Sequence, residues 1–182
     1  MQQLKDIAQI TMGLNSQKLK LVSAGHDTYT AEDLSHDLTA GYQGEYKPSE
    51  SGLVSAGDVV FNSLSQTAAV VSEENAGKAI LQSVLKFQID RSKIDPWYLC
   101  YVLNESQSIK HQLHKRLEGT VMKLLTSTTA KKLNIELPDF AVQQRIGRIY
   151  SQMLVNNQMQ REYIAKSNAA ILELLRIEDK NN

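Results

Sequence analysis

The stretch LNIELPDFAVQQRIGRI, residues 133–149, joins a short apolar strand to a long helix. Its first residues alternate between apolar and polar, which is the period of a half-buried strand, and Pro138 ends that strand. From Ala141 the apolar residues recur at helical spacing as far as Ile177. A strand, a proline stop and a long helix predict a globular module followed by a spacer helix.

The predicted helix carries an apolar seam with a polar centre. Its main row advances in steps of three and four residues: Val142, Ile146, Ile149, Met153, Asn156, Gln160, Tyr163, Ser167, Ala170, Leu174 and Ile177. A neighbouring row consists of Tyr150, Leu154, Ile164, Ile171 and Leu175. This spacing favours a coiled-coil or helical-hairpin partner, and the polar centre weakens the seam while helping to fix its register. A helix of about 36 residues extends ~54 Å, too far for the module to cover, so its outer half should need a partner.

The rest of the chain predicts short strands separated by turns. Strands are expected over 19–22, 59–61, 68–71 and 79–89, with a short strand or helical turn over 4–10. The polar segment Asp27–Gly44 predicts a surface loop. The fold class is therefore α+β, with a compact mixed-sheet domain over 1–138 and a coiled-coil helix over 139–182.

One helix is predicted inside the domain. Asp95 can cap the first free N–H groups, and Pro96 fits the first helical position. Apolar spacing then extends the helix to Glu118, as one piece or as two pieces broken near Asn104.

Composition limits the class of protein. The single cysteine, Cys100, lies in an apolar run, so it excludes an intrachain disulfide and predicts a buried thiol in a cytoplasmic protein. The N-terminus lacks a signal-peptide pattern, and no apolar run reaches membrane-spanning length, so no membrane partner is expected.

The charges balance overall but are distributed unevenly. The formal net charge is zero, which argues against a histone-like nucleic-acid binder. Residues 1–58 hold four Lys against eight Asp and Glu, whereas residues 104–135 hold six Lys and Arg against two Glu. A local basic face can still bind an anionic partner, although an ordinary solvated helix face explains the same charges.

Five landmarks follow one another along the chain: LKDIAQI (4–10) with Gly13, GDVVF (57–61), IDPWYL (94–99) with Leu103 and Asn104, GTVM (119–122) and IELPDFAVQQRI (135–146). Together, in this order, they resemble the specificity (S) subunit of type I restriction-modification systems. No single landmark is specific, but the ordered set covers nearly the whole chain. The sequence departs from the family's common Arg and Gly pattern after Phe61, where it reads NSLSQT (62–67).

The resemblance implies a DNA-reading function without catalysis. A full-length S subunit has two target recognition domains and two spacer helices, whereas this chain has one of each and looks like a half-subunit. Two copies should then dimerise through antiparallel spacer helices, bind double-stranded DNA and read a symmetric, split target. Methyltransferase (M) subunits, and through them the restriction (R) subunit, would be the partners. The expected spacer interface comprises Ile146, Ile149, Met153, Leu154, Asn156, Gln160, Ile164, Ile171 and Leu174.

The candidate DNA-binding residues fall into two groups. Amides and hydroxyls suited to reading bases follow the strand 59–61: Asn62, Ser63, Ser65, Gln66 and Thr67. Residues suited to phosphate contacts, or close to them in the following loop, are Lys110, Lys115, Arg116, Thr120 and Lys123. Both groups are also compatible with ordinary solvated surface.

The sequence gives little support for metal binding, nucleotide stacking, cofactor binding or catalysis. His111 and His114 lack an obvious third metal ligand, so no metal site is expected. Tyr42 and Tyr46 suit stacking on a nucleotide, although core packing or loop anchoring explains them better. No phosphate-binding glycine loop, dinucleotide fingerprint or catalytic triad motif is present, so neither a cofactor nor an enzyme activity is expected. The alternative function is a coiled-coil protein scaffold without DNA specificity.

Overall fold

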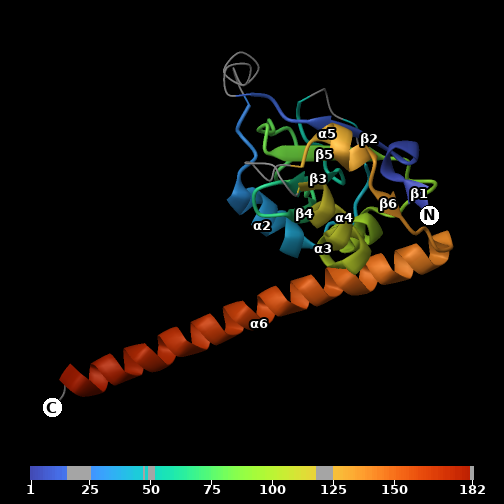
Figure 1. The fold of residues 1–182 in the computed structure, drawn as a ribbon. Coiled ribbons are helices and arrows are strands. Elements are labelled where there is room, and N and C mark those ends of the chain that lie inside the picture. The colour runs from blue at the N-terminus through green and yellow to red at the C-terminus, as the bar shows by residue number, and fades with distance from the viewer. Residues whose placement is uncertain (16–25, 47, 49–51, 118–124, 181–182) are drawn as a thin grey trace.

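A computed structural model describes residues 1–15, 26–46, 48, 52–117 and 125–180. It consists of a globular α+β body from which one helix, α6 (Phe140–Lys180), projects far to one side (Figure 1). The predicted α+β class and the long C-terminal helix are both confirmed. Among the helices of these residues, none is long and apolar enough to cross a membrane.

The body is built on a four-stranded antiparallel sheet. The strand order is β2 (Ala8–Met12), β5 (Val84–Ile89), β3 (Val59–Asn62) and β4 (Thr67–Val70). Strands β3 and β4 form a hairpin in which Asn62 faces Thr67, so the residues between them make a tight turn. The predicted strands over 59–61 and 68–71, and a strand within 79–89, are confirmed.

A second, two-stranded sheet ties the N-terminus to the start of the long helix. It pairs β1 (Gln2–Gln3) with β6 (Asn134–Ile135), and the 3-10 helix η1 (Leu4–Asp6) follows β1. The predicted strand before Pro138 is therefore present but only two residues long. The strand predicted over 19–22 lies outside the described residues.

Both faces of the four-stranded sheet are covered: successive side chains of a strand point to opposite sides, and all four residues of β3 are buried. On one face, Phe61 and Phe87 pack with helices α3 (Pro96–Glu105) and α4 (Gln107–Leu117). On the other face, Val60 packs with Leu34 of helix α2 (Ala31–Ala40). A short helix, α5 (Ser127–Lys131), contacts η1 and β2.

Helix α3 begins as its sequence predicts. The carboxylate of Asp95 accepts a hydrogen bond from the N–H of Tyr98 at 2.8 Å, and Pro96 occupies the first helical position. Ser106 separates α3 from α4, so of the two forms that the sequence left open, one helix or two, the structure has two. The proposed C-terminal cap at Gly119 lies outside the described residues.

The surface loop predicted over Asp27–Gly44 is wrong, because residues 31–40 form α2. A capping box starts this helix: the N–H of Asp33 donates to the Thr30 hydroxyl at 3.2 Å, and the N–H of Thr30 donates to the Asp33 carboxylate at 2.8 Å. Gly41 ends it with a φ of 65°, the left-handed conformation that glycine adopts without strain.

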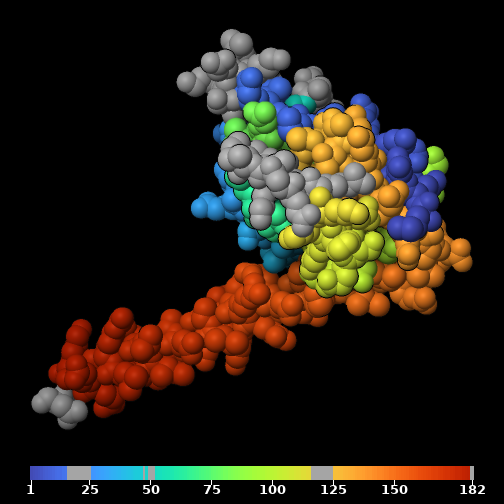
Figure 2. All heavy atoms as spheres, viewed as in Figure 1, coloured from blue at the N-terminus to red at the C-terminus, as the bar shows by residue number. Residues whose placement is uncertain are grey.

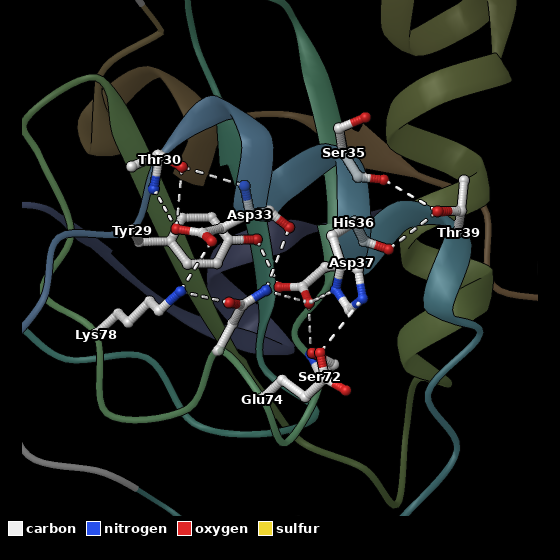
Figure 3. A network of polar contacts seen from close by, with 11 residues as sticks. Tyr29, Thr30, Asp33, Ser35, His36, Asp37, Thr39, Ser72, Glu74 and Lys78 are labelled. Carbon is white, nitrogen blue, oxygen red and sulfur yellow. Dashed lines mark hydrogen bonds and ion pairs between the residues drawn. The ribbon is translucent and has the colours of Figure 1, made fainter.

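A buried polar network fastens α2 to the sheet (Figure 3). The Asp37 side chain is fully buried and accepts hydrogen bonds from the Tyr29 hydroxyl at 2.7 Å, the Asn75 amide at 2.8 Å and the Ser72 N–H at 3.1 Å. All three donors lie outside α2. The network therefore helps to hold this helix in place, although the helix has few apolar residues. Burial and the nearby Asp37 charge raise the pKa of Tyr29.

Only the first turns of α6 pack on the body. Gln143, Gly147, Tyr150 and Ser151 are buried there, chiefly against α3. From residue 159 to 180 every side chain except Ser167 is exposed. Figure 2 shows the consequence, a helix that leaves the body and continues as a free arm.

Candidate functional site

The β3–β4 turn is shaped by two of the side chains that the sequence suggested as base readers. Asn62 is buried, and its Oδ1 accepts hydrogen bonds from the N–H groups of Leu64 at 2.8 Å and Ser65 at 3.4 Å. Ser63 is also buried, and its hydroxyl donates to the Leu125 carbonyl at 3.1 Å. These two side chains therefore support the turn from inside.

The remaining residues of the turn form its outer surface. Leu64, Ser65 and Gln66 are exposed, and Leu64 is 73% exposed. Gln66 has a φ of 53°, the only positive φ of a non-glycine residue in the described parts of the chain. Such a conformation is uncommon outside Gly, Asn and Asp and often marks a functional position. Thr67 is half-buried, and its hydroxyl donates to the Ser65 carbonyl at 3.1 Å.

Asn104 connects this hairpin to α6. Its side-chain amide accepts from the N–H of Ala68 at 2.7 Å and donates to the carbonyl of Ala68 at 3.0 Å, so it pairs with the free edge of β4. The same amide group donates to the hydroxyl of Tyr150 in α6 at 3.1 Å. The turn, the edge strand, α3 and α6 are thus linked by one side chain.

Two of the predicted phosphate-contacting residues lie on α4. Lys110 and Lys115 are exposed, and the Lys110 ammonium lies 3.4 Å from the Glu105 carboxylate. Thr120, Lys123 and the side chain of Arg116 lie outside the described parts. Lys131 and Lys132 are exposed at the end of α5. The charge count over 104–135 included this pair, but the predicted site omitted it.

The other candidates have roles within the fold. The Tyr42 hydroxyl donates to the Glu45 carbonyl at 2.9 Å, and the Arg91 guanidinium lies 4.7 Å from the Tyr46 ring centroid. Cys100 is buried, and burial raises the pKa of its thiol, which disfavours the reactive thiolate. No three His, Cys, Asp or Glu side chains come together as metal ligands in the described part of the chain.

The predicted spacer interface separates into two groups. Ile146 and Leu154 are half-buried and pack against the core of the body. The other members are exposed: Ile149, Met153, Asn156, Gln160, Ile164, Ile171 and Leu174. The sequence pattern identified the apolar rows of this helix but not which row faces the body.

Comparison with known proteins gives one family and a shared fold. Residues 1–166 match the family model of the type I restriction modification DNA specificity domain. No curated protein matches the chain.

The solved structures that are similar to this chain include the following two. A chain from a study of complex assembly and conformational transition of the type I R-M system aligns with a TM-score of 0.59 and 16% identity over 94% of this chain and 42% of its own length. The HsdS subunit from Thermoanaerobacter tengcongensis aligns with a TM-score of 0.49 and 18% identity, over 92% of this chain and 39% of its own. The chain thus spans about two fifths of the length of either structure.

Proposed function

The chain belongs to the family of type I restriction modification DNA specificity domains, and on that basis we propose that it is a half-subunit that reads one half of a split DNA target. Residues 1–138 would be the target recognition domain, and residues 139–182 the spacer. The observation that carries this proposal is the pairing of one globular body with one projecting, apolar-surfaced helix. The full reader would then be a homodimer, acting in the cytoplasm.

The distal part of α6 supports the dimer. Tyr163, Leu174 and Ile177 continue the exposed line of Ile149 and Met153, and each of these side chains is at least 45% exposed. Helices in proteins gain most of their stability by packing an apolar face, so this exposed line requires a partner surface. An antiparallel second copy supplies the same apolar line and places the two bodies at opposite ends.

A second apolar line supports docking of methyltransferase subunits. At about 100° per residue, Ile164, Ile171, Leu172 and Leu175 lie in line with the residues that pack α6 on the body. Together the two lines cover more than half of the helix circumference, whereas one packing partner needs a stripe of about 100°. One helix of a second copy therefore leaves part of the arm uncovered, and a methyltransferase subunit would cover that part.

For DNA reading, we assign the base contacts to the exposed tip of the β3–β4 turn. Side-chain amides pair with adenine, hydroxyls pair with several bases, and apolar groups contact the thymine methyl. Gln66, Ser65 and Leu64 supply one of each kind, with Thr67 beside them. Asn62 and Ser63 would hold the tip in place from behind. Lys110, Lys115, Arg116, Thr120 and Lys123 would contact the backbone phosphates.

A salt titration of DNA binding tests this function. The chain with its methyltransferase subunit should bind one duplex sequence selectively, and affinity should fall as salt rises, because phosphate contacts release counterions. Replacing Lys110 and Lys115 with Ala should lower the slope of log affinity against log salt by about 0.9 for each phosphate that is no longer neutralised. Lys166→Ala, a lysine on the free arm, is the matched control and should leave the slope unchanged. Binding without sequence selectivity at every salt concentration would contradict the proposal.

The competing function is a protein scaffold without DNA specificity, which the exposed arm alone also permits. Substitutions of the proposed base-reading residue Gln66 distinguish the scaffold from the DNA reader. Gln66→Ala should reduce discrimination at one base pair of the target by about 1–3 kcal/mol and leave other positions unchanged. Gln66→Gly keeps the positive φ without strain and also removes the amide, so it separates the role of the amide from a change in turn shape. A scaffold predicts no change in either variant.

A further inference from the structure

Close packing and buried hydrogen bonds hold the joint between the body and α6. Three features hold this joint: a buried amide, a glycine without room for a side chain, and a tyrosine hydroxyl bonded to α3. Together they determine the direction in which α6 leaves the body.

Gln143 provides the first constraint. It is only 2% exposed, and its Oε1 accepts from the N–H of Asp95 at 3.2 Å. Its Nε2 donates to the carbonyl of Pro138 at 2.9 Å and to that of Lys93 at 3.2 Å. One side chain therefore joins three backbone groups from two segments: Lys93 and Asp95 directly before α3, and Pro138 in the linker into α6. The amide has two N–H donors, and both are used.

Gly147 provides the second constraint, one turn further along α6. A Cβ atom at this position would overlap Oδ1 of Asp95 and lie 2.8 Å from the backbone nitrogen of Tyr98. The carboxylate cannot simply move away, because the same Oδ1 caps α3 by accepting from Tyr98 at 2.8 Å. The two helices touch here through backbone and cap, so any side chain at position 147 must push them apart.

Tyr150 provides the third constraint on the same face. Its hydroxyl accepts from Asn104 at 3.1 Å and donates to the Glu105 carboxylate at 3.4 Å, and its ring packs edge-on against Tyr101 with centroids 5.5 Å apart. Asn104 also holds Ala68 in β4, directly after the turn. The orientation of α6 is thereby connected to the strand that carries the proposed base-reading tip.

We propose that Gln143 and Gly147 are positioning residues that set the angle between the recognition domain and its spacer, and so the number of base pairs between the two half-sites that a dimer reads. This inference rests on the proposed function. If the two spacer helices stay paired, a rotation of the body by about 10° about the joint moves a point in the body, about 20 Å from the joint, by about 3.5 Å. That displacement is close to the rise of one base pair, about 3.4 Å. In a dimer, both bodies can rotate in this way. The joint must therefore be rigid for one spacing to be preferred.

Spin-label distance measurement tests the joint itself, whether or not the chain binds DNA. Nitroxides are placed at Gln82→Cys on the body and Lys166→Cys on the arm, and the labelled chain is diluted with excess unlabelled chain so that only intrachain distances are detected. Cys100 is buried and stays unlabelled. The native joint should give one narrow distance. Gly147→Ala and Gln143→Glu should shift that distance by several ångström or broaden it, because the label on α6 lies about 28 Å beyond Gly147.

The matched control is Gln144→Glu, the same change at the neighbouring, exposed position. It should leave the distance unchanged. If Gly147→Ala fails to fold, Gln143→Glu still tests the joint, since it removes two donors without adding bulk. An unchanged, narrow distance in a folded Gln143→Glu protein would overturn the proposal.

Methylation by the complex with its methyltransferase subunit supplies the functional half of the test. A joint variant should keep the two half-site sequences and shift or loosen the preferred spacing by about one base pair. Altered spin-label distances with an unchanged spacing preference would overturn the role in specificity. Absence of sequence-selective methylation by the native complex is a different result, because it refutes the proposed function and leaves the spin-label result standing.

Discussion

The two ends of α6 are one continuous helix, yet they depend on different surroundings. From Phe140 to Leu154 the helix lies on the body and buries residues such as Gln143 and Tyr150. From Met159 to Lys180 it carries several large apolar side chains, all of them exposed. A helical pattern alone therefore does not say what covers a helix. The near end is stabilised by its own chain, whereas the proposed dimer would stabilise the far end by packing a second copy against it.

The largest expected effect distinguishes the two ends by removing the same side chain from each. Tyr150 is 6% exposed and Tyr163 is 75% exposed. Tyr150→Ala should lower the free energy of unfolding of the body by about 3–5 kcal/mol, as for other buried aromatic residues. Tyr163→Ala should change it by less than about 0.5 kcal/mol. Denaturant unfolding, monitored at the Trp97 fluorophore, measures both. Equal losses would mean that the far end is also part of the folded body.

The next effect concerns the far end alone. Leu174 is 64% exposed, so Leu174→Asp should not alter unfolding of the body. In a dimer it removes apolar packing and buries a charge, which should cost about 3 kcal/mol and raise the dissociation constant more than about 100-fold. Sedimentation at micromolar concentration should then detect monomer. Glu173→Gln, on the charged side of the helix, is the control and should remain dimeric. A native chain that is already monomeric under these conditions would refute the half-subunit dimer.

A smaller effect tests where the boundary between buried and free rows lies. Ile146 is half-buried against the core, whereas Ile149, less than one turn later, is 62% exposed. Ile146→Ala should destabilise the body by about 1–2 kcal/mol, and Ile149→Ala by less than about 0.5 kcal/mol. The dimer should respond in the opposite order, since only Ile149 is available to a second copy. Thermal unfolding and sedimentation of the same two proteins provide both readings.

The smallest effect concerns the polar centre between the two ends. Asn156 and Gln160 are exposed and lie on the proposed dimer seam. Replacing both with Leu should strengthen the dimer by about 1 kcal/mol while allowing additional helix registers. Disulfide trapping of cysteines introduced along the arm would detect those registers. A single register in the double variant would show that other residues fix the alignment.

Local signals in the sequence were sufficient to predict some of the helices and where they begin. The Asp95 cap and Pro96 predicted the start of α3, and the helical period predicted α6. Helix α2 was missed because it has little apolar pattern and is held largely by the buried Asp37 network, which only the folded chain assembles. Its capping box, Thr30 with Asp33, was the available signal.

The candidate site was predicted from the chemical types of its side chains. Those types do not show which groups each side chain bonds in the folded chain. Asn62 and Ser63 have the polar groups of base readers, but the folded chain uses those groups to shape the turn. An Asn placed directly before a tight turn often bonds to backbone in this way. Gln143 was overlooked because it is polar and lies off the apolar seam, and its role depends on three backbone groups brought together by the fold.

The positions of methyl groups on DNA decide whether the chain is one half of a symmetric DNA reader. Genomic DNA should be sequenced for methylated bases in cells that produce this chain and the methyltransferase subunit proposed as its partner, as the sole modification system. A symmetric dimer should direct methylation to two inverted copies of one short sequence, separated by a constant number of base pairs. Methylation without a shared sequence, or at a single undivided site, would contradict the half-subunit model.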